Sequence, residues 1–147
     1  MSAGNSLAPH LAPPALGVPM NKVLWILQTL LALAFAMAGF MKLSTPYEDL
    51  AAQGMSAATL YSEGFIHFIG AAELLGALGL VLPGLTKIKP QLTTLAAAGL
   101  FLLMLGALGT HLKLGEFGAS LGPIMFGAVA GFIAWARWKT VPLAGRR

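Results

Sequence analysis

A single carboxylate lies deep inside a long apolar stretch. The run from Phe65 to Gly84 reads FIHFIGAAELLGALGLVLPG, and Glu73 is its only acidic residue. About 18 apolar residues suffice to cross a bilayer as a helix, and an acid at that depth costs about 3 kcal/mol on insertion scales. Such a group must pair with a cation, accept hydrogen bonds or stay protonated. Each of these states can bind a ligand or handle a proton, so Glu73 is a candidate functional residue.

Three other residues can share a site with Glu73. Lys42 ends the preceding apolar run, His111 follows the next one, and His67 lies about 120° away around the same helix. If successive spans alternate in direction, all of them reach one face of the membrane. Lys42 and His111 are the predicted partners of Glu73. Two interpretations stay open: the group pins three helices together, or it orients a ligand or handles protons.

The residue types limit the chemistry of this site. Two histidines and one carboxylate do not have the spacing of a known metal motif, so we predict no metal site. We assign no catalytic residue, and whether the protein is an enzyme stays open. Lys113 and Glu116 are interpreted as solvated loop charges. The absence of cysteine excludes disulfides and thiolate chemistry.

The composition indicates a membrane protein. Hydrophobic residues make up 57% of the 147 residues and charged residues only 10%, whereas about 25% is usual in soluble domains. The net charge is +4 and the isoelectric point is near 9.8. The basic residues flank apolar runs and form no stripe with interleaved aromatic residues, so a nucleic-acid partner is not expected.

Four apolar runs predict an all-α integral membrane protein, an antiparallel four-helix bundle with short connections. The spans are expected at about residues 23–41, 65–82, 92–110 and 121–138. Pro83-Gly84 is expected to end the second span, and Ser120 to cap the fourth. They belong to one domain, residues 21–139, between a flexible Pro/Ala-rich tail (1–20) and a basic C-terminal tail (140–147).

Local patterns refine this architecture. Thr45-Pro46-Tyr47-Glu48 resembles a capping box with proline at the first helical position, which predicts a short helix in the outer loop between the first two spans. Small residues four apart let helices approach closely. Such helix-packing pairs are Ala72 with Gly76 and Gly127 with Gly131.

The distribution of basic residues predicts the orientation. Cytoplasmic loops of membrane proteins are enriched in lysine and arginine. Seven of these residues fall on one side and two, Lys42 and Lys113, on the other; the seven are Lys22, Lys87, Lys89, Arg137, Lys139, Arg146 and Arg147. We therefore expect a multi-pass protein of the plasma (cytoplasmic) membrane, the inner membrane of the cell, with both termini in the cytoplasm.

The ordered motifs resemble those of the DoxX-like family of small four-helix membrane proteins. They are AGFMKL ending at Leu43, FIGAAELLGA ending at Ala77 with Pro83 after it, and Ala98-Gly99, Gly106-Ala107 and His111-Leu112 in the third span. The resemblance matches Lys42, Glu73 and His111 to recurrent polar positions of the family. It implies links to membrane sulfur and quinone redox systems, including subunits of a thiosulfate:quinone oxidoreductase, or to membrane complexes that manage oxidative stress. The proline-rich tail and the loop at 53–56, which lacks a Gly-Tyr-Pro-like turn, depart from the family pattern.

The residues and the resemblance together predict an accessory subunit of a quinone-linked membrane redox system, with a polar site near the outer face. The sequence has no flavin, haem or iron–sulfur motif, so no cofactor is identified. The site is expected to hold a quinone or a similar head group, or to dock a partner helix, and electrons would come from elsewhere. The expected partners are the lipid bilayer and either a second copy of the chain or other membrane redox subunits. Two alternatives stay open: a transporter for a small solute or protons, and an assembly or scaffold protein of a membrane complex.

Overall fold

A computed structural model describes residues 19–145 of the chain, and this part is almost entirely helical. The elements are α1 (Met20–Ser44), α2 (Tyr47–Leu50), the 3₁₀ helix η1 (Ser56–Thr59), α3 (Glu63–Thr86), α4 (Gln91–Lys113) and α5 (Leu121–Lys139). Four of the helices, α1, α3, α4 and α5, are long and apolar enough to span a membrane. The predicted all-α fold with four spans and a short helix after the first is therefore confirmed.

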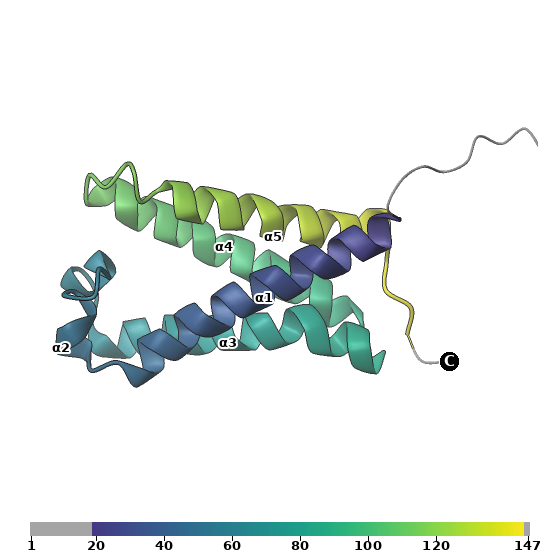
Figure 1. The fold of residues 1–147 in the computed structure, drawn as a ribbon, viewed down its shortest axis with the longest axis horizontal. Helices are drawn as coiled ribbons and strands as arrows, with labels where there is room; N and C mark the ends of the chain where they lie inside the picture. The colour runs from purple at the N-terminus through teal and green to yellow at the C-terminus, as the bar shows by residue number, and fades with distance from the viewer. Residues whose placement is uncertain (1–18, 146–147) are drawn as a thin grey trace, which may run out of the picture.

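The four long helices form two pairs that run side by side (Figure 1). Helix α1 packs along α3, and α4 packs along α5, while α3 and α4 provide the main contact between the pairs. The pairs spread apart at the end that carries α2, η1 and the α4–α5 connection, here called the loop end. The other end, where α1 begins and α5 ends, is called the termini end.

The interior and the exterior of the bundle are both apolar. Apolar side chains from all four long helices, mostly leucine and alanine, form one buried cluster, which includes Leu24, Phe35, Leu80, Leu100 and Ile133. The outer surface carries large apolar side chains such as Met37 and Leu75, which are 74% and 70% exposed. An apolar surface of this extent needs lipid rather than water around it.

The end of α3 differs from the prediction. Pro83 and Gly84 do not end the helix, which continues to Thr86. A proline lacks a backbone N–H and so removes one hydrogen bond of the helix. Within a membrane bundle, side chains of a neighbouring helix can donate to the carbonyl groups of the weakened turn. Here the Gln28 amide of α1 donates to the Leu80 carbonyl at 2.6 Å. Gly84 lets the Trp25 ring approach, because a methyl group on it would lie 2.8 Å from that ring.

Two predicted helix caps are wrong. The residue before α2 is Pro46, not Thr45, and no side chain caps this helix. The backbone N–H of Thr45 instead donates to the Met41 carbonyl at the end of α1. Ser120 precedes α5, but its hydroxyl donates to the Glu116 carbonyl at 3.1 Å. In both cases the hydroxyl-bearing residue belongs to the preceding turn of the chain.

The described residues begin and end within the two predicted tails. Residues 1–18 of the predicted tail, residues 1–20, lie outside the described residues, and Met20 belongs to α1. In the C-terminal segment, residues 140–145 are described. Val141 packs on the core cluster, and Leu143 lies near Gly84 of α3.

Candidate functional site

Two glycines bring α1 and α3 into backbone contact at the loop end. A methyl group on Gly39 would lie 2.6 Å from the Gly70 carbonyl oxygen, and one on Gly70 would lie 2.9 Å from Lys42 Cβ. Neither position can therefore carry a side chain without moving a helix. Sequence reasoning did not single out Gly39; each glycine lies one turn before a charged residue, Lys42 or Glu73.

This close approach makes a short ion pair between the two helices. Lys42 Nζ donates to Glu73 Oε2 at 2.7 Å, and the two side chains are only 14% and 5% exposed. Side chains of a helix tilt toward its N-terminus. Because α1 and α3 are antiparallel, the tilt of Lys42 and that of Glu73 point toward each other. Of the two predicted partners, the structure thus pairs Lys42 with Glu73.

One oxygen of Glu73 has no protein partner in residues 19–145. Lys42 occupies Oε2, and no described side chain or amide donates to Oε1. Glu73 and Lys42 both line a cavity of about 570 Å³ at the loop end, between the α1–α3 pair and the α4–α5 pair. The carboxylate can therefore accept a hydrogen bond from a molecule in this cavity.

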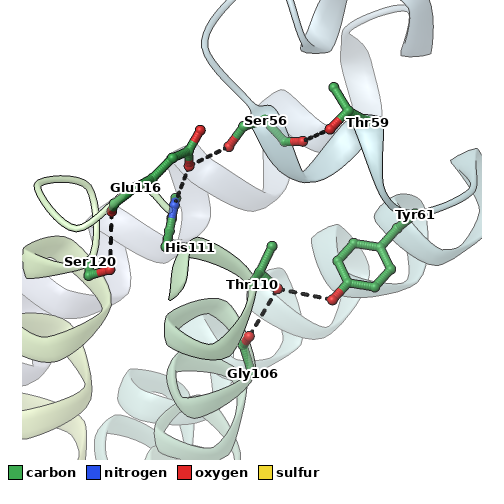
Figure 2. Close-up of polar contacts among 8 residues, drawn as sticks. All are labelled: Ser56, Thr59, Tyr61, Gly106, Thr110, His111, Glu116 and Ser120. Carbon is green, nitrogen blue, oxygen red and sulfur yellow. Dashed lines mark hydrogen bonds and ion pairs between the residues drawn. The ribbon is translucent and has the colours of Figure 1, made fainter. Parts of the chain in front are cut away.

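His111 lies on the opposite wall of the cavity but does not bind Glu73. Its Nδ1 lies 2.8 Å from Glu116 Oε2, and Ser56 of η1 donates to the same oxygen at 2.8 Å (Figure 2). These hydrogen bonds lower the pKa of Glu116 below its usual value of 4.5, His111 contributing most. Glu116, interpreted as a solvated loop charge, has a side chain that is 35% exposed, and it also joins the end of α4 to η1.

The turn at the end of α4 explains this contact. The backbone N–H of Glu116 donates to the His111 carbonyl, and that of Gly115 donates to the Leu112 carbonyl. Gly115 has a φ of +74°. This is a Schellman motif, in which a left-handed glycine reverses the chain after a helix. It folds Glu116 back over His111. The sequence signal was the glycine directly after the last turn, four residues beyond the histidine.

A loop covers the cavity at the loop end. This covering loop, residues 53–61, supplies Gln53, Gly54, Met55, Ser56, Ala57 and Tyr61 to the cavity wall. Its position is fixed by Tyr47, whose hydroxyl donates to the Ala58 carbonyl at 2.7 Å. Tyr61 also lies 3.1 Å from the Thr110 hydroxyl of α4, as Figure 2 shows. Tyr61 and Thr110 are polar residues of the site that sequence reasoning missed, because neither stands in an unusual context.

His67 is separate from this arrangement. It is half-buried on α3, does not line the cavity, and makes no hydrogen bond or ion pair with a described residue. The structure thus brings Lys42, Glu73 and His111 around one cavity and leaves His67 outside it. Among residues 19–145, no three His, Asp or Glu side chains lie together as a metal site would require.

A second polar cluster lies at the termini end and has a different character. Arg137 is 3% exposed; its Nε donates to Gln28 Oε1 at 2.6 Å and its Nη1 to Asn21 Oδ1 at 2.7 Å. The guanidinium also lies over the Trp25 ring, 5.7 Å from its centre. Sequence reasoning placed Arg137 among the cytoplasmic charges and missed this burial. The cluster ties α1 to α5 and does not border the cavity.

The predicted small-residue pairs lie at helix contacts within the chain. A methyl group on Gly76 would lie 2.5 Å from Leu100 of α4. Methyl groups on Gly127 and Gly131 of α5 would lie 3.2 Å from Met104 and 3.3 Å from Phe101, also of α4. Ala72 faces the space between α3 and α4.

Comparison with known proteins gives one match. The model of the DoxX-like family matches residues 26–133, a segment that contains Lys42, Glu73 and His111. No curated protein and no solved structure matches the chain.

Proposed function

The chain belongs to the DoxX-like family, and we propose that it is an accessory subunit of a quinone-linked membrane redox system, whose loop-end cavity binds the quinone head group. The observation that carries this proposal is the free Oε1 of Glu73 beside Lys42 in a cavity of about 570 Å³. Ligand sites usually have volumes of about 300–1,000 Å³ and a few polar groups on apolar walls. The family resemblance suggests the quinone.

The polar groups suit both redox states of a quinone. The Lys42 ammonium has three N–H donors and uses one on Glu73, so it can donate to a quinone carbonyl. The free oxygen of Glu73 can accept from a quinol hydroxyl. Reduction of the quinone takes up two electrons and two protons. In this proposal an electron-donating partner subunit supplies the electrons, and the Lys42–Glu73 pair relays protons to the ring oxygens.

The cavity favours ligand binding over a purely structural pair. An ion pair that only holds α1 and α3 together needs no space beside it. The Arg137 cluster illustrates the structural case: Arg137 Nη2 also has no partner among the described residues, but this buried guanidinium lies at a packed helix contact and does not line the cavity. At Glu73 a free acceptor faces a cavity, which is the arrangement expected of a ligand site.

The two alternatives have less support. A transport path would have to cross the apolar core between the clusters, where Phe35, Ala77 and Leu100 are buried. A scaffold that recruits partners through Gly127 and Gly131 would need these glycines on a free face. In the described part of the chain they contact α4.

Binding of a quinone to purified protein tests the proposal. Full-length protein in detergent is titrated with ubiquinone-1, and the variant Glu73→Gln is compared with Glu63→Gln. Glu63 is a matched control because it lies on the same helix, is exposed and does not line the cavity. We expect Glu73→Gln to lose affinity and Glu63→Gln to keep it. Equal affinity in both variants would refute the proposed site.

The orientation and the compartment are part of the same proposal. The excess of lysine and arginine at the termini end supports termini in the cytoplasm and a cavity in the outer half of the plasma membrane. A C-terminal reporter that is active only after export is expected to be inactive in this protein. An active fusion would place the cavity on the cytoplasmic side instead.

A further inference from the structure

An apolar groove lies next to the cavity and follows the bundle. It lies between α3 and α4, has a volume of about 450 Å³, and is lined only by apolar side chains and glycines. Two of its residues, Gly99 and Leu103 of α4, also line the polar cavity. The cavity and the groove are therefore neighbours that share Gly99 and Leu103.

Glycine and alanine at the helix contacts shape this groove. Gly76 packs on Leu100, and Gly79 packs on Ala96, so close that a methyl group on either glycine would lie within 2.6 Å of its neighbour. The groove follows α3 from Ala72 to Pro83, which is about 16 Å at the rise of an α-helix. This length suits an extended hydrocarbon chain of a ligand, and the groove walls offer such a ligand no polar group.

The polar cavity also reaches the lipid-facing surface. Phe68 of α3 and Leu102 of α4 both line it, yet they are 64% and 65% exposed. A molecule dissolved in the bilayer can therefore reach the cavity sideways, between α3 and α4, without passing through water.

We propose that the cavity and the groove hold one molecule, a quinone with an isoprenoid tail, whose head lies beside Glu73 and whose tail passes Gly99 into the α3–α4 groove. This inference rests on the proposed head-group site and adds the tail site and the route of access. A tail-less head group would fill only the cavity. The position of an apolar groove directly beside the polar cavity, with Gly99 and Leu103 bordering both, is what favours a long-tailed ligand.

Gly99 provides a sharp test because it can carry a side chain without disturbing the protein. It is exposed, and a methyl group on it would meet no atom within 4 Å. Gly99→Phe therefore fills the junction between cavity and groove. Gly109→Phe is the matched control, since Gly109 lies on the same helix, is exposed and equally open, and lines neither space. Gly99→Leu serves as a smaller second variant.

The experiment measures binding of decylubiquinone and of tail-less ubiquinone-0 to full-length protein in one detergent. Each variant is compared with the original protein for the same ligand, so that partitioning into detergent cancels. We expect Gly99→Phe to weaken decylubiquinone at least tenfold, equivalent to about 1.4 kcal/mol, and Gly99→Leu to weaken it less. Because Gly99 also borders the cavity, both variants should weaken ubiquinone-0 too, but by a clearly smaller factor than decylubiquinone. Gly109→Phe should change neither affinity.

The other outcomes separate this inference from the head-group site. If Gly99→Phe leaves decylubiquinone binding unchanged, the tail does not lie in the groove and membrane lipid fills it. If it weakens both ligands equally, Gly99 borders the head alone; either result overturns the tail site while the head-group site stands. If the original protein binds neither quinone, the proposed function falls and the tail site with it.

Discussion

The ion pair between Lys42 and Glu73 can be tested by a double-mutant cycle. Its 2.7 Å separation corresponds to an attraction of about 6 kcal/mol at an effective dielectric constant of about 20. Removing each ion from water costs several kcal/mol, so the net contribution of the intact pair is near zero. The loss of one partner is different, because it leaves the other charge buried and uncompensated.

The cycle uses Lys42→Met, Glu73→Leu and the double variant. Lys42→Met should lower the free energy of unfolding by about 3–5 kcal/mol, since Glu73 is then left without a cation in an apolar bundle. Glu73→Leu should cost less, because Lys42 lies at a helix end and can turn its ammonium toward the interface. The double variant should lie within about 2 kcal/mol of the original protein, because apolar replacement of a buried pair is close to neutral.

Unfolding is followed by circular dichroism of protein in mixed micelles with increasing dodecyl sulfate. The decisive quantity is the coupling free energy, which should exceed about 2 kcal/mol for a buried charged pair. Additive single-variant effects would refute the reasoning. A nearly silent Lys42→Met would also refute it, because it would mean that Glu73 is protonated and needs no cation.

Three further perturbations test separate parts of the structure. Gly39→Ala should destabilise the protein by about 1–3 kcal/mol, because the methyl group overlaps the Gly70 carbonyl; the open position Gly106 is the control, where alanine should be neutral or stabilise by up to about 1 kcal/mol in the same unfolding assay. The hydrogen bonds of Glu116 lower the pKa of its carboxyl group below 4.5. They should therefore hold the covering loop fully above pH 4.5 and release it as the pH falls through the lowered pKa. A spin label on this loop should stay immobile at pH 5, and mobility there would contradict the contact. Arg137→Gln should cost about 1–3 kcal/mol through unsatisfied buried groups and leave ubiquinone-1 affinity unchanged, since the cluster lies at the end opposite the cavity.

The sequence was sufficient for the spans, and it named Lys42 as one of two predicted partners of Glu73; the reason is physical. Lipid forces each span to be a long apolar helix, so hydropathy alone locates it. An isolated acid such as Glu73 needs a cation within the membrane, and few are present at the right depth. Lys42 could be inferred as a partner for that reason, even though the rotation of its helix about the helix axis was not known.

Other residues could not be found because their roles depend on helix rotation and close packing. In a chain with 18 glycines, nothing marks Gly39 as the one that contacts the opposing backbone. Arg137 stands where interfacial arginines usually stand, and only the turn of α5 toward Gln28 buries it. Glu116 bonds His111 through a reversal of the chain at Gly115, which hydropathy does not detect.

The position of the cavity follows from the positions of the glycines. Gly76 and Gly79 bring α3 and α4 together toward the termini end, whereas Gly39 and Gly70 bring α3 and α1 together at the loop end. Beyond Gly76, α3 therefore follows α1 and leaves α4, as the spread of the two pairs in Figure 1 shows. Glu73 lies one turn beyond Gly76 in that direction, where the divergence begins, so the carboxylate stays buried against α1 while its free oxygen faces the space that α4 has left. The divergence thus opens the cavity beside the buried pair, whereas the groove follows the part of α3 that Gly76 and Gly79 hold against α4.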